Sequence, residues 1–363
     1  MKKYFLYLLK KNLLPLLCLT LFCIVLYVVP VSVQDYSRWN LYGSSHYYYN
    51  SPALYYGNIS AALGLLSVFV PIYLFSYKMN RRSVDMYYSL PLNKTKILIT
   101  NLLVGLFLLY VPYTFAYLWG FVTVAARVKR LYLIYYLYLY LASLVPALIM
   151  YTVTAFIYTR ANTIIDGILS VVGALFLLAM VWTAVESMYY DYDWYPSGIS
   201  FEHFFPFSPL ISVTDVFGRA VIDGKVAKWF VYSNKSGLRK ETGELINAVL
   251  WTLLATAAAV GLILTEKNCK AENCRQISNS IFCFKVQIPV YTALLTAAAW
   301  STTENIPLLC AIAFGAFVVS VIYKRTIKIG WKFAVVLAAC FLGGILFSIV
   351  SNALIYASGA GVI

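Results

Sequence analysis

The sequence predicts an all-α, polytopic membrane protein with about eight or nine transmembrane helices and a small extracellular subdomain. Hydrophobic residues make up 62% of the 363 residues and charged residues only 12%, which lies outside the range of soluble domains. Several apolar runs exceed about 18 residues, the length that a helix needs to cross a bilayer. These runs are longer than the alternating segments of about ten residues that build a membrane β-barrel, so they predict helices.

The N-terminal part, residues 1–185, is expected to hold five membrane helices. Residues 1–12 are basic at both ends around an aromatic and aliphatic middle, and no small-residue cleavage site follows. This pattern predicts an interfacial helix that leads into the first span, not a cleaved signal peptide. A connecting loop is expected at 122–130 and a tight turn at 159–162. The five spans are expected at 13–33, 59–77, 97–121, 131–158 and 163–185.

The rest of the chain is expected to form a loop subdomain followed by four more spans. Residues 186–246 are the longest polar stretch, aromatic and acidic at first, and predict an extracellular subdomain. Residues 247–363 form the C-terminal membrane part, in which Gly343 and Gly344 permit close helix contact. The four spans are expected at 247–265, 286–300, 306–323 and 333–356.

The basic residues follow this layout. The segments expected to be cytoplasmic hold 18 of the 28 Lys and Arg residues and three of the 14 acids, whereas ten acids fall on the other side. This bias predicts a multi-pass protein of the plasma membrane with a cytoplasmic N-terminus, whose basic loops attract anionic lipid headgroups. The net charge of +14 therefore does not indicate nucleic-acid binding.

The stretch 78–96 between the second and third spans is longer than a change of direction needs. It has nineteen residues, five of them basic and one acidic. Pro91 ends any helix here, because it lacks an N–H and disfavours α geometry for Leu90. The spacing before it predicts a short amphipathic helix along the cytoplasmic face, suited to a soluble partner. The alternative is a basic loop that only fixes orientation. The polar residues are Arg81, Arg82 and Asp85, and the apolar ones are Val84, Met86, Tyr87 and Leu90.

Residues 81–96, RRSVDMYYSLPLNKTK, resemble the R-S-x-D-x-x-x-S-L-P-hydrophobic-x-[RK] segment of bacterial ABC exporter permeases of the second type. In that family the segment forms the coupling helix that docks on the ATPase, and we expect Tyr87 to be its apolar anchor. The ATPase-coupling residues that the resemblance implies are Arg81, Arg82, Val84, Asp85, Met86, Tyr87, Leu90 and Pro91.

A second segment is similar to the R-x-x-E stretch that follows the sixth span of these permeases. It lies at 266–275, and the resemblance implies a second cytoplasmic contact through Glu272 and Arg275. The family usually has Gly soon after this Glu, whereas Asn273 and Cys274 follow it here.

The resemblance implies a permease subunit of an ATP-driven exporter. No GxxxxGK[ST] loop occurs, so we expect this chain to bind no cofactor or metal, to be no enzyme, and to depend on ATP and Mg²⁺ held by a separate ABC ATP-binding subunit. A second membrane subunit, identical or homologous, is expected. Spans with few charges and many aromatic residues suit an amphipathic or hydrophobic substrate such as a drug, a peptide antibiotic or a lipid-like compound.

Two other functions remain open. The chain is alternatively a non-transporting sensor or scaffold of an ABC complex, which would not stimulate an ATPase. It is otherwise a membrane enzyme whose site lies in the outer loop with Glu202 and His203. Asp166 stands near the inner end of the fifth span, where we expect an interfacial or helix-N-terminal acid and not a proton relay.

Overall fold

The computed structural model is that of a polytopic helical membrane protein, which confirms the predicted fold class. It describes residues 2–33, 51–89, 91–127, 133–188, 210, 237–266, 283–303, 306–324 and 330–357, with residues 274, 276, 278 and 280. Seven helices within this part of the chain are long and apolar enough to cross a membrane. They lie at Leu13–Val33, Ala61–Met79, Lys94–Ala126, Leu139–Tyr158, Asn247–Glu266, Ile306–Lys324 and Trp331–Ser351.

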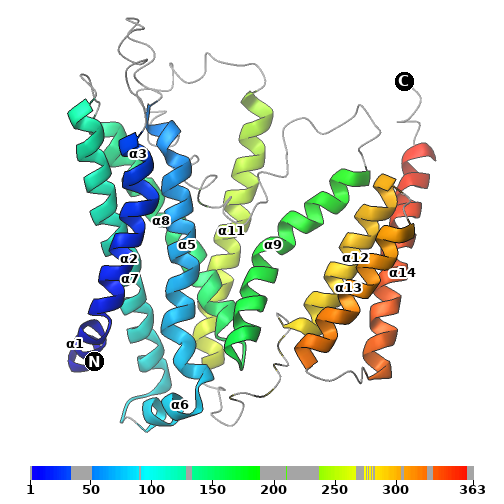
Figure 1. Cartoon of the computed structure of the whole chain (residues 1–363), viewed down its shortest axis with the longest axis horizontal. Helices are drawn as coiled ribbons and strands as arrows, with labels where there is room; N and C mark the ends of the chain where they lie inside the picture. The colour runs from blue at the N-terminus through cyan, green and yellow to red at the C-terminus, as the bar shows by residue number, and fades with distance from the viewer. Residues whose placement is uncertain are drawn as a thin grey trace, which may run out of the picture. The chain divides into compact units, whose positions relative to one another are not determined.

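Each of the nine expected spans coincides with a helical segment (Figure 1). The expected spans at 163–185 and 286–300 are α9 and α12, which are helical but do not belong to the seven; the apolar part of α9 is the shorter Ile164–Leu177. The elements are α1 (Lys2–Lys11), α2 (Leu13–Cys23), η1 (Ile24–Val28), α3 (Val29–Val33), α5 (Ser51–Phe75), η3 (Ser76–Met79), α6 (Arg81–Tyr88), α7 (Lys94–Arg127), α8 (Leu133–Tyr158), α9 (Ile164–Met188), α11 (Gly237–Glu266), α12 (Phe284–Thr303), α13 (Ile306–Lys324) and α14 (Trp331–Ala357).

Two helices run further than expected into regions that were predicted as loops. The predicted loop at 122–130 is helical through Arg127, because Phe121–Ala126 contains no Gly or Pro that would end α7. Likewise α11 begins at Gly237, inside the predicted subdomain, because its polar first turns contain good helix formers such as Arg239, Lys240 and Glu241. The predicted subdomain otherwise lies outside the described residues, apart from Leu210 and the start of the segment in α9.

The helices form two compact units, and their grouping does not follow the order of the chain. Unit 1 consists of residues 1–156 and 207–273, and unit 2 consists of residues 157–206 and 274–363. Unit 1 therefore takes α11 from the C-terminal part of the sequence, and unit 2 takes α9 from the N-terminal part.

Unit 1 is built around α7, the longest helix described, which contacts α1, α2, η1, α3, α5 and α11. Leu98, Leu108 and Leu109 of α7 are at most 1% exposed. Gly105 allows a close approach of α8, since the Tyr151 hydroxyl occupies the space of a side chain there and donates a hydrogen bond to the Leu102 carbonyl, 3.2 Å away. Because α1 and α5 both pack closely against α7, the three helices form one packed group in unit 1.

The first span bends through a π-helical segment, η1, between α2 and α3. Pro30 lies two residues after its last residue, Val28, and has no N–H to give to the Leu26 carbonyl four residues earlier. A local change to wider hydrogen bonding is a usual response of a helix to such a defect.

Unit 2 is built around α12, which contacts α9, α13 and α14. The contact with α14 is close because Gly344 faces α12: a Cβ placed there would lie 2.4 Å from the carbonyl oxygen of Ala293. The predicted close contact at the paired glycines is thus confirmed for Gly344, whereas a Cβ at Gly343 would meet nothing within 4 Å.

Candidate functional site

The stretch between α5 and α7 folds as the sequence predicts, into a short helix bounded by two turns. After η3, Asn80 is extended, with φ −110° and ψ 114°, and its carbonyl accepts the first bond of α6 from the Val84 N–H at 2.9 Å. The Ser89 N–H closes the helix on the Asp85 carbonyl at 3.1 Å. Pro91 is exposed in the turn that follows, and α7 begins after Asn93. Leu90 lies outside the described residues.

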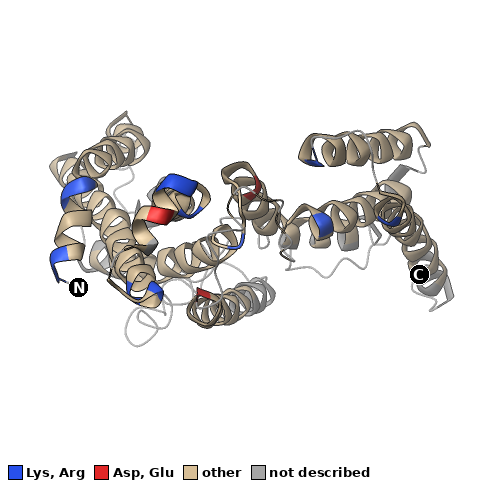
Figure 2. Ribbon diagram, turned by 90° about the horizontal axis from the view of Figure 1, so that it is seen from below, with Lys and Arg blue, Asp and Glu red and all other residues tan. Residues whose placement is uncertain are grey.

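Helix α6 has one buried face and one exposed face, and its apolar residues are divided between them. Val84 and Tyr87 are 2% and 4% exposed, whereas Met86 is 51% exposed. Residues three apart share a face of a helix, so Val84 and Tyr87 point inward together and Met86 points away from them. The exposed face is formed by Arg81, Arg82, Asp85 and Met86. Figure 2 views the molecule from the end at which α6 lies and colours the positions of its basic and acidic residues.

This arrangement differs from the expectation that Tyr87 is the apolar anchor for a partner. The Tyr87 ring packs inside unit 1 against Tyr77 of η3, with 4.4 Å between the ring centroids and 46° between the planes. The Lys11 ammonium at the end of α1 donates a hydrogen bond to the Tyr87 hydroxyl at 3.2 Å. The inward position of Tyr87 follows from this aromatic and polar pocket, which α6 meets only in the folded chain.

The hydrogen bond to Tyr87 favours the charged form of the Lys11 ammonium. Burial alone would lower the pKa of the Lys11 ammonium, but the hydrogen bond to Tyr87 and the neighbouring tyrosines outweigh burial, so the pKa lies above its ordinary value. The junction after Lys11 is fixed as well. Asn12 is 4% exposed, donates to the Leu8 carbonyl at 2.9 Å and accepts a hydrogen bond from the Tyr73 hydroxyl of α5 at 3.1 Å.

A buried ion pair joins η3 to the end of α11. The ammonium of Lys78 contacts a carboxylate oxygen of Glu266, and the two side chains are 7% and 3% exposed. The two residues are 188 positions apart in the sequence, so no local pattern could have indicated the pair. Each charge needs the other, because an isolated charge in such surroundings would be strongly destabilising.

Helix α6 is therefore held at the end of unit 1 by contacts on two sides. Tyr87 connects it to α1, and the turn before it is connected to α11 through Lys78 (Figure 1). Among the α6 side chains whose burial is described, the exposed face carries Arg81, Arg82, Asp85 and Met86. A protein bound to this face would act on helix ends that are fixed to α6, not on a loose loop.

Several predicted site residues lie outside the described part of the chain. These are Glu272 and Arg275 of the second predicted contact, and Glu202 and His203 of the alternative enzyme site. Within the described residues no group of three or more His, Cys, Asp or Glu side chains could hold a metal ion. No protein-family model, curated protein or solved structure matches this chain.

Proposed function

We propose that this chain is the membrane subunit of an ATP-driven ABC exporter and that α6 is its coupling helix. The observation that carries the proposal is the two-faced packing of α6, with Arg81, Arg82, Asp85 and Met86 exposed and Val84 and Tyr87 buried. The resemblance of residues 81–96 to the coupling segment of these permeases supports the same role.

In the proposed mechanism a separate ATP-binding subunit, which holds ATP and Mg²⁺, docks on the exposed face of α6 from the cytoplasm. Closure of the ATP sites moves α6, and its buried contacts carry the movement to α1 through Lys11 and to α11 through the Lys78–Glu266 pair. Tightly packed contacts of this kind transmit displacement because they resist deformation. Two ATP sites require two membrane subunits, so we propose a dimer of like or homologous chains in the plasma membrane.

The proposed docking face differs in energetic character from the buried face. Exposed charged pairs at Arg81, Arg82 and Asp85 are worth about 0–1 kcal/mol each. Among the α6 side chains whose burial the structure describes, Met86 is the exposed apolar one, and it is the better candidate for insertion into a pocket of the partner. Together these contacts support selective, reversible docking.

The test compares the two faces in the purified chain reconstituted with a Walker-motif ATPase that co-purifies with it. Arg82→Glu/Met86→Asp should lower stimulation of the ATPase at least tenfold, equivalent to about 1.4 kcal/mol or more, and leave thermal stability of the membrane subunit unchanged. Tyr87→Ala should lower both, since it opens a cavity beneath α6. Lys332→Glu, a charge reversal at an exposed residue of α14, is the matched control.

Two results would contradict the proposal. If the Arg82→Glu/Met86→Asp variant stimulates the ATPase like wild type, α6 is a topological anchor. If the wild-type chain binds the ATPase stably without stimulating it, the chain is a sensor or scaffold of the complex.

A further inference from the structure

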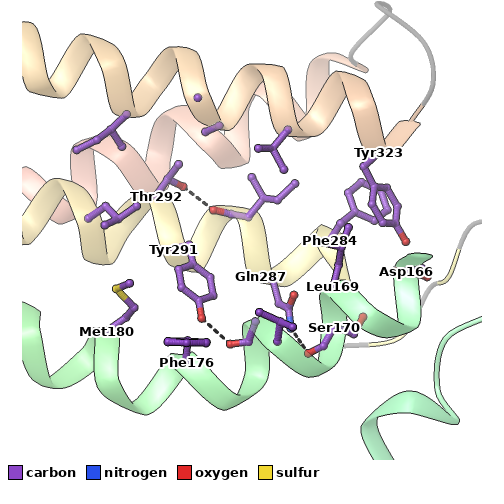
Figure 3. Close-up of a pocket in the computed structure, with 18 residues that line it drawn as sticks. Asp166, Leu169, Ser170, Phe176, Met180, Phe284, Gln287, Tyr291, Thr292 and Tyr323 are labelled. Carbon is purple, nitrogen blue, oxygen red and sulfur yellow. Dashed lines mark hydrogen bonds between the residues drawn. The ribbon is translucent and has the colours of Figure 1, made fainter. Parts of the chain in front are cut away.

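Unit 2 contains a cavity that the coupling role does not explain. Helices α9, α12 and α13 line a half-open cavity of about 610 Å³, which is within the range of small-molecule sites (Figure 3). Most of its wall is apolar. The apolar side chains that line it include Leu169, Phe176 and Met180 of α9, Leu295 of α12, and Ile312 and Val319 of α13.

The polar side chains on the wall between α9 and α12 are mostly occupied with the backbone. Gln287 of α12 donates from Nε2 to the carbonyl of Ser170 at 2.9 Å, and the Tyr291 hydroxyl donates to the carbonyl of Gly173. These bonds fasten α12 to α9 and fix the width of the cavity between them (Figure 3). Because Gln287 Nε2 and the Tyr291 hydroxyl proton are already bonded to the backbone, neither group decides which charge a ligand must carry.

Asp166 at one end of the cavity is the exception. It lines the cavity and is only 2% exposed, and within the described residues neither carboxylate oxygen accepts a hydrogen bond of good geometry; the nearby Tyr323 hydroxyl interacts with the carboxylate but carries no positive charge. Its position near the start of α9 gives it some stabilisation from the helix dipole. Its backbone N–H donates a hydrogen bond to the Thr163 hydroxyl oxygen at 3.2 Å. That is less than a buried carboxylate normally receives, because buried charges are generally paired.

No ion pair to Asp166 is found among the described residues. The Cys283 thiol accepts a hydrogen bond from Ser170 at 3.6 Å, and burial raises the pKa of this thiol, which keeps it neutral at pH 7. The Lys324 ammonium lies 4.3 Å from the ring centroid of Phe333, a cation–π contact of its own. The Tyr323 side chain lies beside Asp166 (Figure 3).

Two aromatic rings stand at the same end of the cavity. Phe284 and Tyr323 are stacked, with 3.7 Å between centroids and 26° between planes, and both line the cavity. The faces of aromatic rings attract cations, most strongly where water is excluded. A buried carboxylate next to aromatic rings is the chemistry that selects an organic cation over a neutral or anionic molecule.

We propose that this cavity binds an amphipathic organic cation, with its positive group at Asp166, Phe284 and Tyr323 and its apolar body along α9 and α13. Because Asp166 is so little exposed, the positive group reaches the carboxylate by displacing the partly exposed Tyr323 side chain. The inference specifies the substrate class of the proposed exporter and rests on that function only in calling the ligand a substrate.

The probe is tritiated tetraphenylphosphonium, a permanent lipophilic cation, bound to the purified full-length chain in detergent without ATPase or nucleotide. Saturable binding is expected, and neutral triphenylphosphine oxide should compete poorly. Asp166→Asn removes the charge and keeps the shape, so it should weaken binding about tenfold or more. Glu186→Gln, the same change twenty positions further along α9 and about 30 Å away, should leave binding unchanged.

A second pair of variants tests the cavity while leaving Asp166 in place. Gly315 lines the cavity and Gly343 of α14 does not, and a Cβ at either would meet nothing within 4 Å. Gly315→Leu should therefore fill the cavity without disturbing its neighbours and lower binding about tenfold, whereas Gly343→Leu should bind like wild type. Monodisperse elution and an unchanged unfolding temperature are required of each variant.

The inference is overturned if wild type shows no saturable binding, if the neutral compound competes as well as a cation, or if both Asp166→Asn and Gly315→Leu bind like wild type. Equal competition by the neutral compound would identify the cavity as an apolar groove filled by lipid. Since no ATPase is present in this assay, wild-type ATPase stimulation by the Arg82→Glu/Met86→Asp variant, together with retained cation binding, would contradict only the exporter function. A wild-type chain that stimulates the ATPase but does not bind the cation would contradict only this inference.

Discussion

Lys78 and Glu266 are the residues on which the position of α6 depends most directly. Replacing one partner leaves the other charge buried at 7% or 3% exposure without compensation. Breaking a buried pair in this way typically destabilises a protein by about 3–5 kcal/mol. We expect Glu266→Gln to lower the unfolding temperature of the purified chain in detergent and to make α6 exchange its amide hydrogens faster.

The Lys78→Met/Glu266→Gln double variant separates the charge penalty from the loss of packing. It removes both charges, so it should recover much of the stability that Glu266→Gln loses, because no buried charge is then left without its partner. An unfolding temperature for Glu266→Gln equal to that of wild type would show that the pair does not hold η3 to α11.

At this scale the sequence predicts the boundaries of α6 but not its orientation. The Leu90–Pro91 break and the helical spacing before it are local, and they locate the end of the helix. Which apolar residues face inward depends on Tyr77 and Lys11, which meet Tyr87 only after folding. Asp166 was predicted as an ordinary interfacial acid near a helix start; its burial beside Phe284 and Tyr323 depends on α12 and α13, more than a hundred residues away.

At the scale of the helices, the contact between α12 and α14 at Gly344 offers a direct test of packing. A Cβ at Gly344 would lie 2.4 Å from the backbone oxygen of Ala293, which cannot move aside like a flexible side chain. Gly344→Ala should therefore push α14 away from α12 and cost about 1–3 kcal/mol, more than the gain in helix propensity returns. The measurement is the unfolding temperature of the purified chain.

Gly343→Ala is the matched control for that substitution. Its Cβ would meet nothing within 4 Å, so only the improved helix propensity remains and the unfolding temperature should stay the same or rise slightly. Equal effects of the two substitutions would mean that α12 and α14 do not pack at Gly344.

The helices themselves were largely predictable, because long apolar runs must satisfy their backbone groups internally. Their ends were less so. Helix α7 continues through Arg127, and α11 begins at Gly237, since polar residues with good helix propensity extend a helix without any apolar signal. The expected span at α12 carries the polar residues Gln287 and Tyr291. Their role is seen only in the folded chain, where both donate hydrogen bonds to backbone carbonyls of α9.

For the whole molecule, the contact of Lys11 with Tyr87 fixes α1 and α6 at the same end of unit 1. Cysteines introduced singly at Lys3 and Ser83 of a cysteine-free chain should therefore react with a membrane-impermeant maleimide from the same side of the membrane. The positive-inside bias predicts that this side is the cytoplasm, so both should label in inverted vesicles and not in intact cells. Labelling of Ser83→Cys in intact cells would reverse the proposed orientation, and labelling of the two sites from opposite sides would contradict the structure of unit 1.

The division of the chain into two units was beyond the reach of the sequence. A linear reading divides the chain at the polar stretch 186–246, because that is where the apolar pattern is interrupted. The helices instead group by surface fit, with α11 joining α7 in unit 1 and α9 joining α12 in unit 2. Shape complementarity between helices leaves little trace in composition, since lipid-facing and helix-facing residues are equally apolar.

The interrupted course of unit 1 has a consequence for how the protein is made. Lys78 leaves the ribosome 188 residues before Glu266, an interval of roughly ten to forty seconds at ordinary rates of synthesis. All of α9, which belongs to the other unit, is made in between. During that interval the first helices wait in the membrane with an uncompensated cation at their margin. Arrival of α11 supplies Glu266, so we expect the N-terminal helices to acquire their final packing only after residue 266 has been made.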